Sequence, residues 1–269
     1  RPIPKESARM PNNTSAQAAS LPQVRPVWIN STVVLLELRR KFRNLRIFIL
    51  AILLPVMFFF MLAYPQRDRL EGSVNSGTYY MIGISAYAAI VSSSAVGAAI
   101  PIERVQGWSR ALALTPFRPL GYVITKVLSS MLLGAIAVVV MMVLGLVTGM
   151  PLDAWQAAQS SLIIIAGSSA FAAFGIFVGY FMSADSAQTL INLIISVFSM
   201  FGGLFFPLSH FPQALQDIAH WLPSYGLGVL ARLPVGVEWD PWALVNLVAW
   251  LVIFVAGAAW CLSKDTHRV

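Results

Sequence analysis

Six apolar stretches that contain no Asp, Glu, Lys or Arg dominate this chain. A helix that crosses the hydrocarbon core of a bilayer needs about 20 apolar residues, and all six are long enough to cross. Since 58% of the residues are hydrophobic and only 11% charged, the chain cannot cover itself with a polar surface. We therefore predict an all-α membrane protein with six transmembrane helices. The stretches are Ile47–Tyr64, Thr78–Ile102, Val127–Leu152, Ala154–Ala184, Ser186–Gln216 and Pro241–Ser263.

The boundary between the fourth and fifth stretches is weak, because only the polar segment from Ser183 to Ser186 separates them. Five spans are the alternative, if this segment is a kink within one helix. The combined length of the two stretches favours two helices joined by a tight turn. The fourth helix is then expected from Ala157 to Met182, and the fifth is expected to end near Phe206.

Lysine and arginine are distributed unevenly between the two sides of the predicted membrane domain. With the N-terminus inside, eleven of them flank the inner ends of the spans and three lie in outer loops. Because cytoplasmic loops of membrane proteins carry this excess, we expect both termini to be cytoplasmic in a plasma or inner membrane. The inner residues are Arg39, Arg40, Lys41, Arg43, Arg46, Arg104, Arg110, Arg118, Lys126, Lys264 and Arg268, and the outer ones are Arg67, Arg69 and Arg232.

The N-terminal part of the chain divides into two segments. Residues 1–27 are rich in Pro, Ala, Ser and Asn and contain no apolar run, which predicts a disordered cytoplasmic arm. Residues 28–269 form the predicted membrane domain. Its first segment, Trp28–Asn44, has an apolar beginning and a basic end, which indicates an interfacial helix. A cytoplasmic extension of the first span is the alternative.

Residues that drive chemistry are missing from the predicted spans. No span holds a central Asp, Glu, Lys or Arg, although transporters driven by protons or voltage usually need such groups. A P-loop is missing as well, since no lysine follows a glycine, and the three histidines lack a set of metal ligands. The single cysteine, Cys261, excludes an internal disulfide. We therefore expect no catalytic and no metal site, and an energy source outside this chain.

Small and polar residues mark three of the spans. Gly145 and Gly149, like Gly175 and Gly179, have the spacing that lets membrane helices approach closely. The fifth span carries four polar residues on one helical face, which lines a substrate path or only forms hydrogen bonds to neighbouring helices. These residues are Gln188, Asn192, Ser196 and Ser199.

The segment from Pro101 to Pro116, between the second and third spans, reads as a short amphipathic helix that Pro101 can open and Thr115-Pro116 closes. An ordinary loop helix is the plain interpretation. Its pattern resembles that of ABC type-2 transporter permeases, in which this stretch is the coupling helix that docks on the ATPase subunit. The resemblance assigns this role to Glu103, Arg104, Gly107, Arg110, Leu112, Thr115 and Pro116.

A second stretch, after the fifth span, resembles the same family. Prolines break the helix there, and the residues between Pro212 and Pro223 have the apolar spacing of a short helix at the outer face. In the family this element is a re-entrant outer gate. The matching residues are Gly203, Pro207, Pro212, Pro223 and Tyr225.

The resemblance implies a permease subunit of an ABC exporter that moves a hydrophobic drug, antibiotic or lipid-like substrate. ATP and Mg would bind a separate ATPase subunit, and a second copy or homologue of the permease would complete the complex, without nucleic acid. A membrane sensor or scaffold that signals through a cytoplasmic partner is the alternative, and a secondary transporter is disfavoured by the uncharged spans. We expect the path to be lined by Phe58, Phe59, Phe60, Asn192, Phe198 and Phe205.

Overall fold

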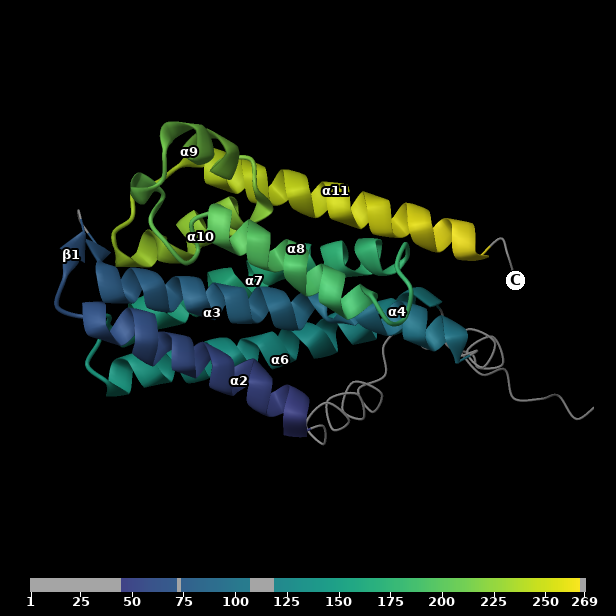
Figure 1. Cartoon of the computed structure of the whole chain (residues 1–269), viewed down its shortest axis with the longest axis horizontal. Helices are drawn as coiled ribbons and strands as arrows, with labels where there is room; N and C mark the ends of the chain where they lie inside the picture. The colour runs from purple at the N-terminus through teal and green to yellow at the C-terminus, as the bar shows by residue number, and fades with distance from the viewer. Residues whose placement is uncertain (1–44, 72–73, 107–118, 267–269) are drawn as a thin grey trace, which may run out of the picture.

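The computed structural model describes residues 45–71, 74–106 and 119–266. These residues form a bundle of helices that run along one long axis (Figure 1). The first half contains α2 (Leu45–Phe58), the π-helix η1 (Phe59–Ala63), the 3-10 helix η2 (Tyr64–Gln66), β1 (Leu70–Glu71), β2 (Val74–Asn75), α3 (Ser76–Ser94), α4 (Val96–Val105) and α6 (Pro119–Val147). The second half contains α7 (Ala154–Gly179), α8 (Ala187–Phe201), the 3-10 helix η3 (Leu208–His210), α9 (Gln213–Ala219), α10 (Pro223–Arg232), the 3-10 helix η4 (Leu233–Val235) and α11 (Pro241–Thr266).

The prediction of an all-α fold is confirmed, apart from one antiparallel hairpin of two residues a strand. Each predicted stretch falls on a helix. Among the described residues, four helical segments are long and apolar enough to cross a membrane: Ser76–Glu103, which consists of α3 and most of α4, and Ile124–Val147, Ala154–Gly179 and Pro241–Cys261. Two apolar helices are shorter, Ile52–Gln66 and Ala187–Phe201. The predicted arm, the helix at Trp28–Asn44 and residues 107–118 lie outside the described residues.

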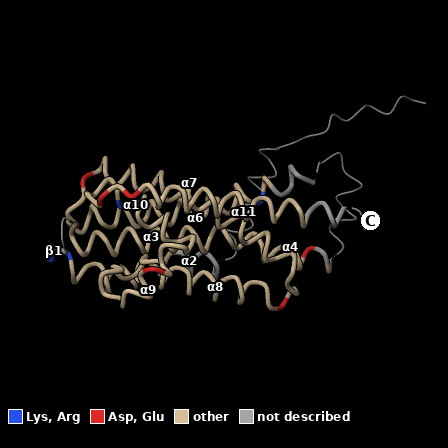
Figure 2. Tube along the Cα trace, turned by 90° about the horizontal axis from the view of Figure 1, so that it is seen from above, with Lys and Arg blue, Asp and Glu red and all other residues tan. Residues whose placement is uncertain are grey.

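The charged residues lie towards the two ends of the bundle, and its middle is uncharged (Figure 2). One end, here called the hairpin end, carries β1, β2, α9 and the starts of α7 and α11 (Figure 1). The other end, here called the α4 end, carries the C-terminal ends of α4 and α11 (Figure 1). A helix bundle with an uncharged middle and charged ends is suited to a bilayer about 30 Å thick in its hydrocarbon core.

Helix α3 lies at the centre of the bundle and packs against α2, α6, α7, α8 and α10 (Figure 1). Its side chains are mostly small, and most of them are buried. Its largest core residues, among them Met81 and Ile84, are completely inaccessible to solvent. Since lipid tails are as apolar as a protein core, close packing of small residues is what holds such helices together.

The pair Gly175 and Gly179 forms the predicted close helix contact. A Cβ atom at Gly175 would lie 2.2 Å from the carbonyl oxygen of Ser94, and one at Gly179 would lie 2.1 Å from that of Gly97. A Cβ atom at Gly97 would in turn lie 1.8 Å from the carbonyl oxygen of Gly175. Backbone therefore meets backbone where α7 crosses the junction of α3 and α4.

The two glycines of the other pair, Gly145 and Gly149, have different roles. Gly145 faces the sulfur of Met81, at 2.3 Å from an added Cβ, so it provides helix packing. Gly149 has a φ of +73° and open space around its missing side chain. It follows the end of α6, where a left-handed residue commonly terminates a helix. The close-packing prediction is thus confirmed for Gly145 and wrong for Gly149.

Helices α7 and α8 are separate, joined by a turn in which the amide of Ala187 donates to the carbonyl of Ser183. The predicted tight turn is confirmed here. Helix α8 ends at Phe201 and not near Phe206, because Gly203 adopts a left-handed conformation with a φ of +78°. The amide of Leu204 then donates to the carbonyl of Ser199, which closes the helix end.

Helix α11 forms one edge of the bundle (Figure 1) and exposes most of its length. Apolar side chains such as Val252 and Ile253 are exposed along its middle. Exposed tryptophans lie near its two ends, at Trp242 and Trp260. Tryptophan is enriched where a helix passes from hydrocarbon into the headgroup region.

Candidate functional site

The α4 end holds the first residue of the predicted coupling motif. Glu103 lies in the last turn of α4, and its carboxylate accepts a hydrogen bond and ion pair from the ammonium of Lys126 on α6. Both side chains are largely buried, with exposed fractions of 16% for Glu103 and 8% for Lys126. Glu103 is therefore a link between two helices of this chain.

Helix α4 passes through Pro101, so the prediction that Pro101 opens a new helix is wrong. Proline lacks an amide hydrogen, which leaves the carbonyl four residues earlier without its helical donor. That carbonyl belongs to Gly97, and it lies against Gly179 of α7. The close contact with α7 thus falls where the helix has lost a hydrogen bond.

Only the start of the predicted coupling motif lies within the described residues. Arg104 lies in α4, but its side chain is not described. The remaining five residues, Gly107, Arg110, Leu112, Thr115 and Pro116, lie outside the described residues. Helices α3 and α4 form a nearly continuous helical arm that leads from the core of the bundle to residue 106. The first residues of the motif are therefore connected directly to the core.

The predicted gate residues lie together at the hairpin end, where each proline begins a helix. Pro207 and Pro212 are the N-cap residues of η3 and α9, and Pro223 is in the first turn of α10. The short helix expected between Pro212 and Pro223 is α9. Helix α10, which follows it, was not predicted as a helix, and nearly all of it is buried.

Tyr225 joins this segment to α11. Its hydroxyl donates to the carboxylate of Asp240 over 2.6 Å, and its ring meets that of His220 edge to face at 4.7 Å. Burial raises the pKa of Tyr225, and the hydrogen bond to Asp240 raises it further. The phenol therefore keeps its proton and acts as a fixed donor.

The corner between α9 and α10 is also fixed to α11. The carbonyl of His220 accepts from the indole N–H of Trp242 over 2.9 Å and from the amide of Asn246 over 3.0 Å. The carbonyl of Trp221 accepts from the indole N–H of Trp250 over 2.8 Å. Three side chains of α11 thus hold the end of α9.

Arg232 is a residue of this region that sequence reasoning placed wrongly. We expected an outer loop charge, but Arg232 ends α10 and is 2% exposed. Its guanidinium donates to the carbonyls of Gly203 and Leu204, which follow α8, over 3.2 and 2.8 Å. Burial lowers the pKa of this guanidinium. The only signal in the sequence is an isolated charge within an apolar segment.

The structure brings together some of the predicted path residues. Phe58 of α2 meets Phe205 edge to face, with ring centroids 6.2 Å apart, and Tyr87 of α3 lies 4.9 Å from Phe205. The hydroxyl of Tyr87 also shares a hydrogen bond of 3.2 Å with Ser196 of α8. Half-buried Asn192 lies one turn earlier on α8, where its carbonyl accepts from the Ser196 hydroxyl.

The other path residues lie elsewhere. Phe59 is completely buried in the core, and Phe198 packs on Phe174 of α7 with centroids 5.9 Å apart. Phe60 is 48% exposed on α2's continuation into η1. The three consecutive phenylalanines therefore point in different directions, as helical geometry requires. We call Phe58, Tyr87, Ser196 and Phe205 the aromatic cluster.

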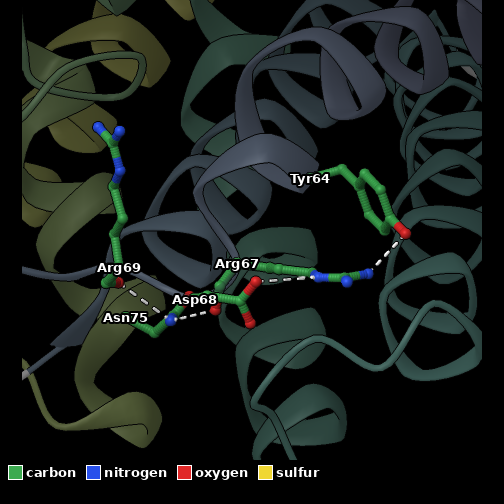
Figure 3. A network of polar contacts seen from close by, with 5 residues as sticks. All are labelled: Tyr64, Arg67, Asp68, Arg69 and Asn75. Carbon is green, nitrogen blue, oxygen red and sulfur yellow. Dashed lines mark hydrogen bonds and ion pairs between the residues drawn. The ribbon is translucent and has the colours of Figure 1, made fainter.

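The connection from η2 to α3 is held by a polar network at the hairpin end (Figure 3). Asn75 caps α3 by accepting from the amide of Thr78, and its side-chain amide donates to the carbonyls of Arg67 and Arg69. Arg67 in turn donates to the hydroxyl of Tyr64 and pairs with Asp68. This network is structural, since it closes a tight loop at the start of α3.

Comparison with known proteins agrees with these features. A family model described as "ABC-2 family transporter protein" matches residues 64–262. The chain is also similar to the "Putative transport permease YvfS" of Bacillus subtilis (strain 168), with 23% identity over 235 residues. That alignment covers 86% of this chain and 94% of YvfS.

Proposed function

Since this chain belongs to the ABC-2 transporter family, as a transmembrane permease subunit that lacks an ATPase, we propose that it works as an exporter with six spans. Permeases of this family generally pair with an ABC ATPase subunit. In our proposal, ATP and Mg bind that partner, and a second copy or homologue of this chain completes the transporter. The α4 end and both termini face the cytoplasm, and the hairpin end faces outward.

The arm formed by α3 and α4 is the observation that carries this proposal. It runs from the centre of the bundle to residue 106 and so contains the first residues of the segment Pro101–Pro116 that resembles a coupling helix. The buried ion pair between Glu103 and Lys126 fixes its end to α6. A displacement imposed on residues 107–118 would therefore reach both α4 and α6, and through them the core.

The aromatic cluster supports the substrate class. It joins α2, α3 and α8 with three rings and one shared hydroxyl bond. Aromatic rings with few polar groups suit a hydrophobic drug, antibiotic or lipid-like molecule. Rearrangement of these helices in two protomers would open a path past the cluster towards the outer gate.

The test is a pull-down of the full chain from its native membrane, followed by an ATPase assay of the recovered complex. Wild type is compared with Arg110→Ala in the coupling segment and with Arg69→Ala, an exposed control at the hairpin end. We expect an ATPase to be recovered with wild type and Arg69→Ala, and to be lost with Arg110→Ala. Recovery of a different cytoplasmic partner, with no ATPase, would refute the exporter and favour a sensor or scaffold.

A further inference from the structure

Arg232 makes contacts with three separate parts of the chain, and the proposed function above assigns no role to them. Besides Gly203 and Leu204, its guanidinium donates to the carbonyl of Tyr79 in α3 over 3.2 Å and to that of Gly228 in α10 over 3.2 Å. Its Cζ atom lies 3.5 Å from the centroid of the Tyr79 ring. Among the residues that the structure describes, no carboxylate lies within ion-pair distance of Arg232.

A buried arginine without a carboxylate must be stabilised by dipoles. A charge taken out of water is costly unless each of its donors is satisfied. Here backbone carbonyls supply the acceptors, and those of Gly203 and Leu204 lie in the turn directly after α8. The face of the Tyr79 ring adds a further attraction for the cation. Only a planar fork with several donors can reach all of these groups at once.

The position of the turn after α8 depends on these contacts. The hydroxyl of Tyr79 donates to the carbonyl of Gly203 over 2.9 Å, so this carbonyl accepts from both Tyr79 and Arg232. On α3, a Cβ atom at Gly83 would lie 1.8 Å from the carbonyl oxygen of Leu204 and 2.5 Å from Arg232. The turn is thus pressed against the backbone of α3, and Arg232 holds it there.

We propose that Arg232 is the positioning residue of the outer gate, which pins the turn at Gly203 and Leu204 to α3 and keeps the gate closed at rest. This inference rests on the proposed function, because it assigns a gating role to a segment of the permease. Opening the gate requires the turn to leave α3, and that movement breaks the bonds from Arg232 to Gly203 and Leu204 together. Arg232 therefore sets how readily the gate opens.

The first measurement is hydrogen–deuterium exchange of the full chain in lipid nanodiscs. Arg232→Lys keeps the charge but loses the fork, and Tyr79→Phe is a milder variant that loses only one hydroxyl. We expect amides of residues 202–212 to exchange at least about tenfold faster in Arg232→Lys, and less so in Tyr79→Phe. Amides in the middle of α7 should be unchanged. Arg69→Lys, at an exposed arginine of the same end, should match wild type.

The second measurement uses the complex with its ATPase and compares exchange of the same amides with and without ATP. In wild type we expect ATP to increase exchange at residues 202–212, and in Arg232→Lys we expect high exchange in both conditions. Unchanged exchange in Arg232→Lys, or an equal increase in every helix, would overturn the pin. A local increase that leaves the ATP effect intact would overturn the gating role. If no ATPase is recovered, the proposed function fails, while the first measurement still decides whether Arg232 pins the turn.

Discussion

The buried pair of Glu103 and Lys126 leads to a quantitative prediction. Removing one partner of a buried ion pair leaves an uncompensated charge, which typically costs about 3–5 kcal/mol. Because Glu103 retains an exposed fraction of 16%, we expect the lower end of that range for Lys126→Met, about 3 kcal/mol. For a chain of this size, that loss corresponds to a decrease of roughly 6–12 °C in the unfolding midpoint. The double variant Glu103→Gln with Lys126→Met should lose much less, since no charge remains.

The chain carries its own probe for this measurement. Cys261 is its only cysteine and is buried, so a thiol-reactive dye will report unfolding in detergent without engineering. A double-mutant cycle over the two positions should show a coupling of at least about 1 kcal/mol. If the costs of the two single variants simply add in the double variant, the two groups do not stabilise each other and the reasoning is refuted.

The same pair separates two roles of Glu103 in ATPase binding. Glu103→Ala would lower ATPase recovery either because Glu103 touches the ATPase or because α4 separates from α6. The exchanged pair, Glu103→Lys with Lys126→Glu, restores an internal ion pair but presents the opposite charge at position 103. Restored ATPase recovery would assign Glu103 to the internal link, and continued loss would assign it to docking.

Two further predictions concern helix packing. Gly175→Leu should lower the dye-detected midpoint by an amount equivalent to at least about 1–3 kcal/mol, because its Cβ would lie 2.2 Å from the carbonyl oxygen of Ser94, whereas Gly149→Asn should stay close to wild type. Equal effects of the two would contradict the backbone contact. Trp242→Phe removes the N–H donor to the carbonyl of His220 and should cost about 1 kcal/mol, with faster amide exchange at the end of α9 and no change in α6.

The helices were predictable because apolar runs of this length have few alternatives to crossing a membrane. The residues at which these helices end were harder to predict. The fifth apolar run continues through Phe206, which conceals the end of α8 at Phe201, although Gly203 is the type of residue that ends a helix. At Pro101 the error was the reverse, because we predicted a helix start where α4 continues. Helix α4 tolerates this proline where the carbonyl of Gly97, which has lost its helical donor, faces α7.

The side-chain contacts of the site could not be predicted for a different reason. Arg232 is held by carbonyls of Tyr79 and Gly203, which belong to other parts of the chain. Glu103 meets Lys126 across the segment between α4 and α6. A single sequence shows which residues are charged but not which distant groups they meet, so Arg232 was expected in an outer loop and Glu103 at the contact with the ATPase.

Helix α11 sets a requirement on the membrane itself. Trp242 and Trp260 are 18 positions apart on one continuous helix, which corresponds to about 27 Å along its axis. This distance is slightly less than the hydrocarbon thickness of an average bilayer, so both tryptophans come near the headgroup regions only when α11 lies close to the membrane normal. Thicker membranes would increase this mismatch, and because α11 holds the corner of α9 and α10, the strain would reach the proposed outer gate. Bilayer thickness is thus a variable to which this permease should respond.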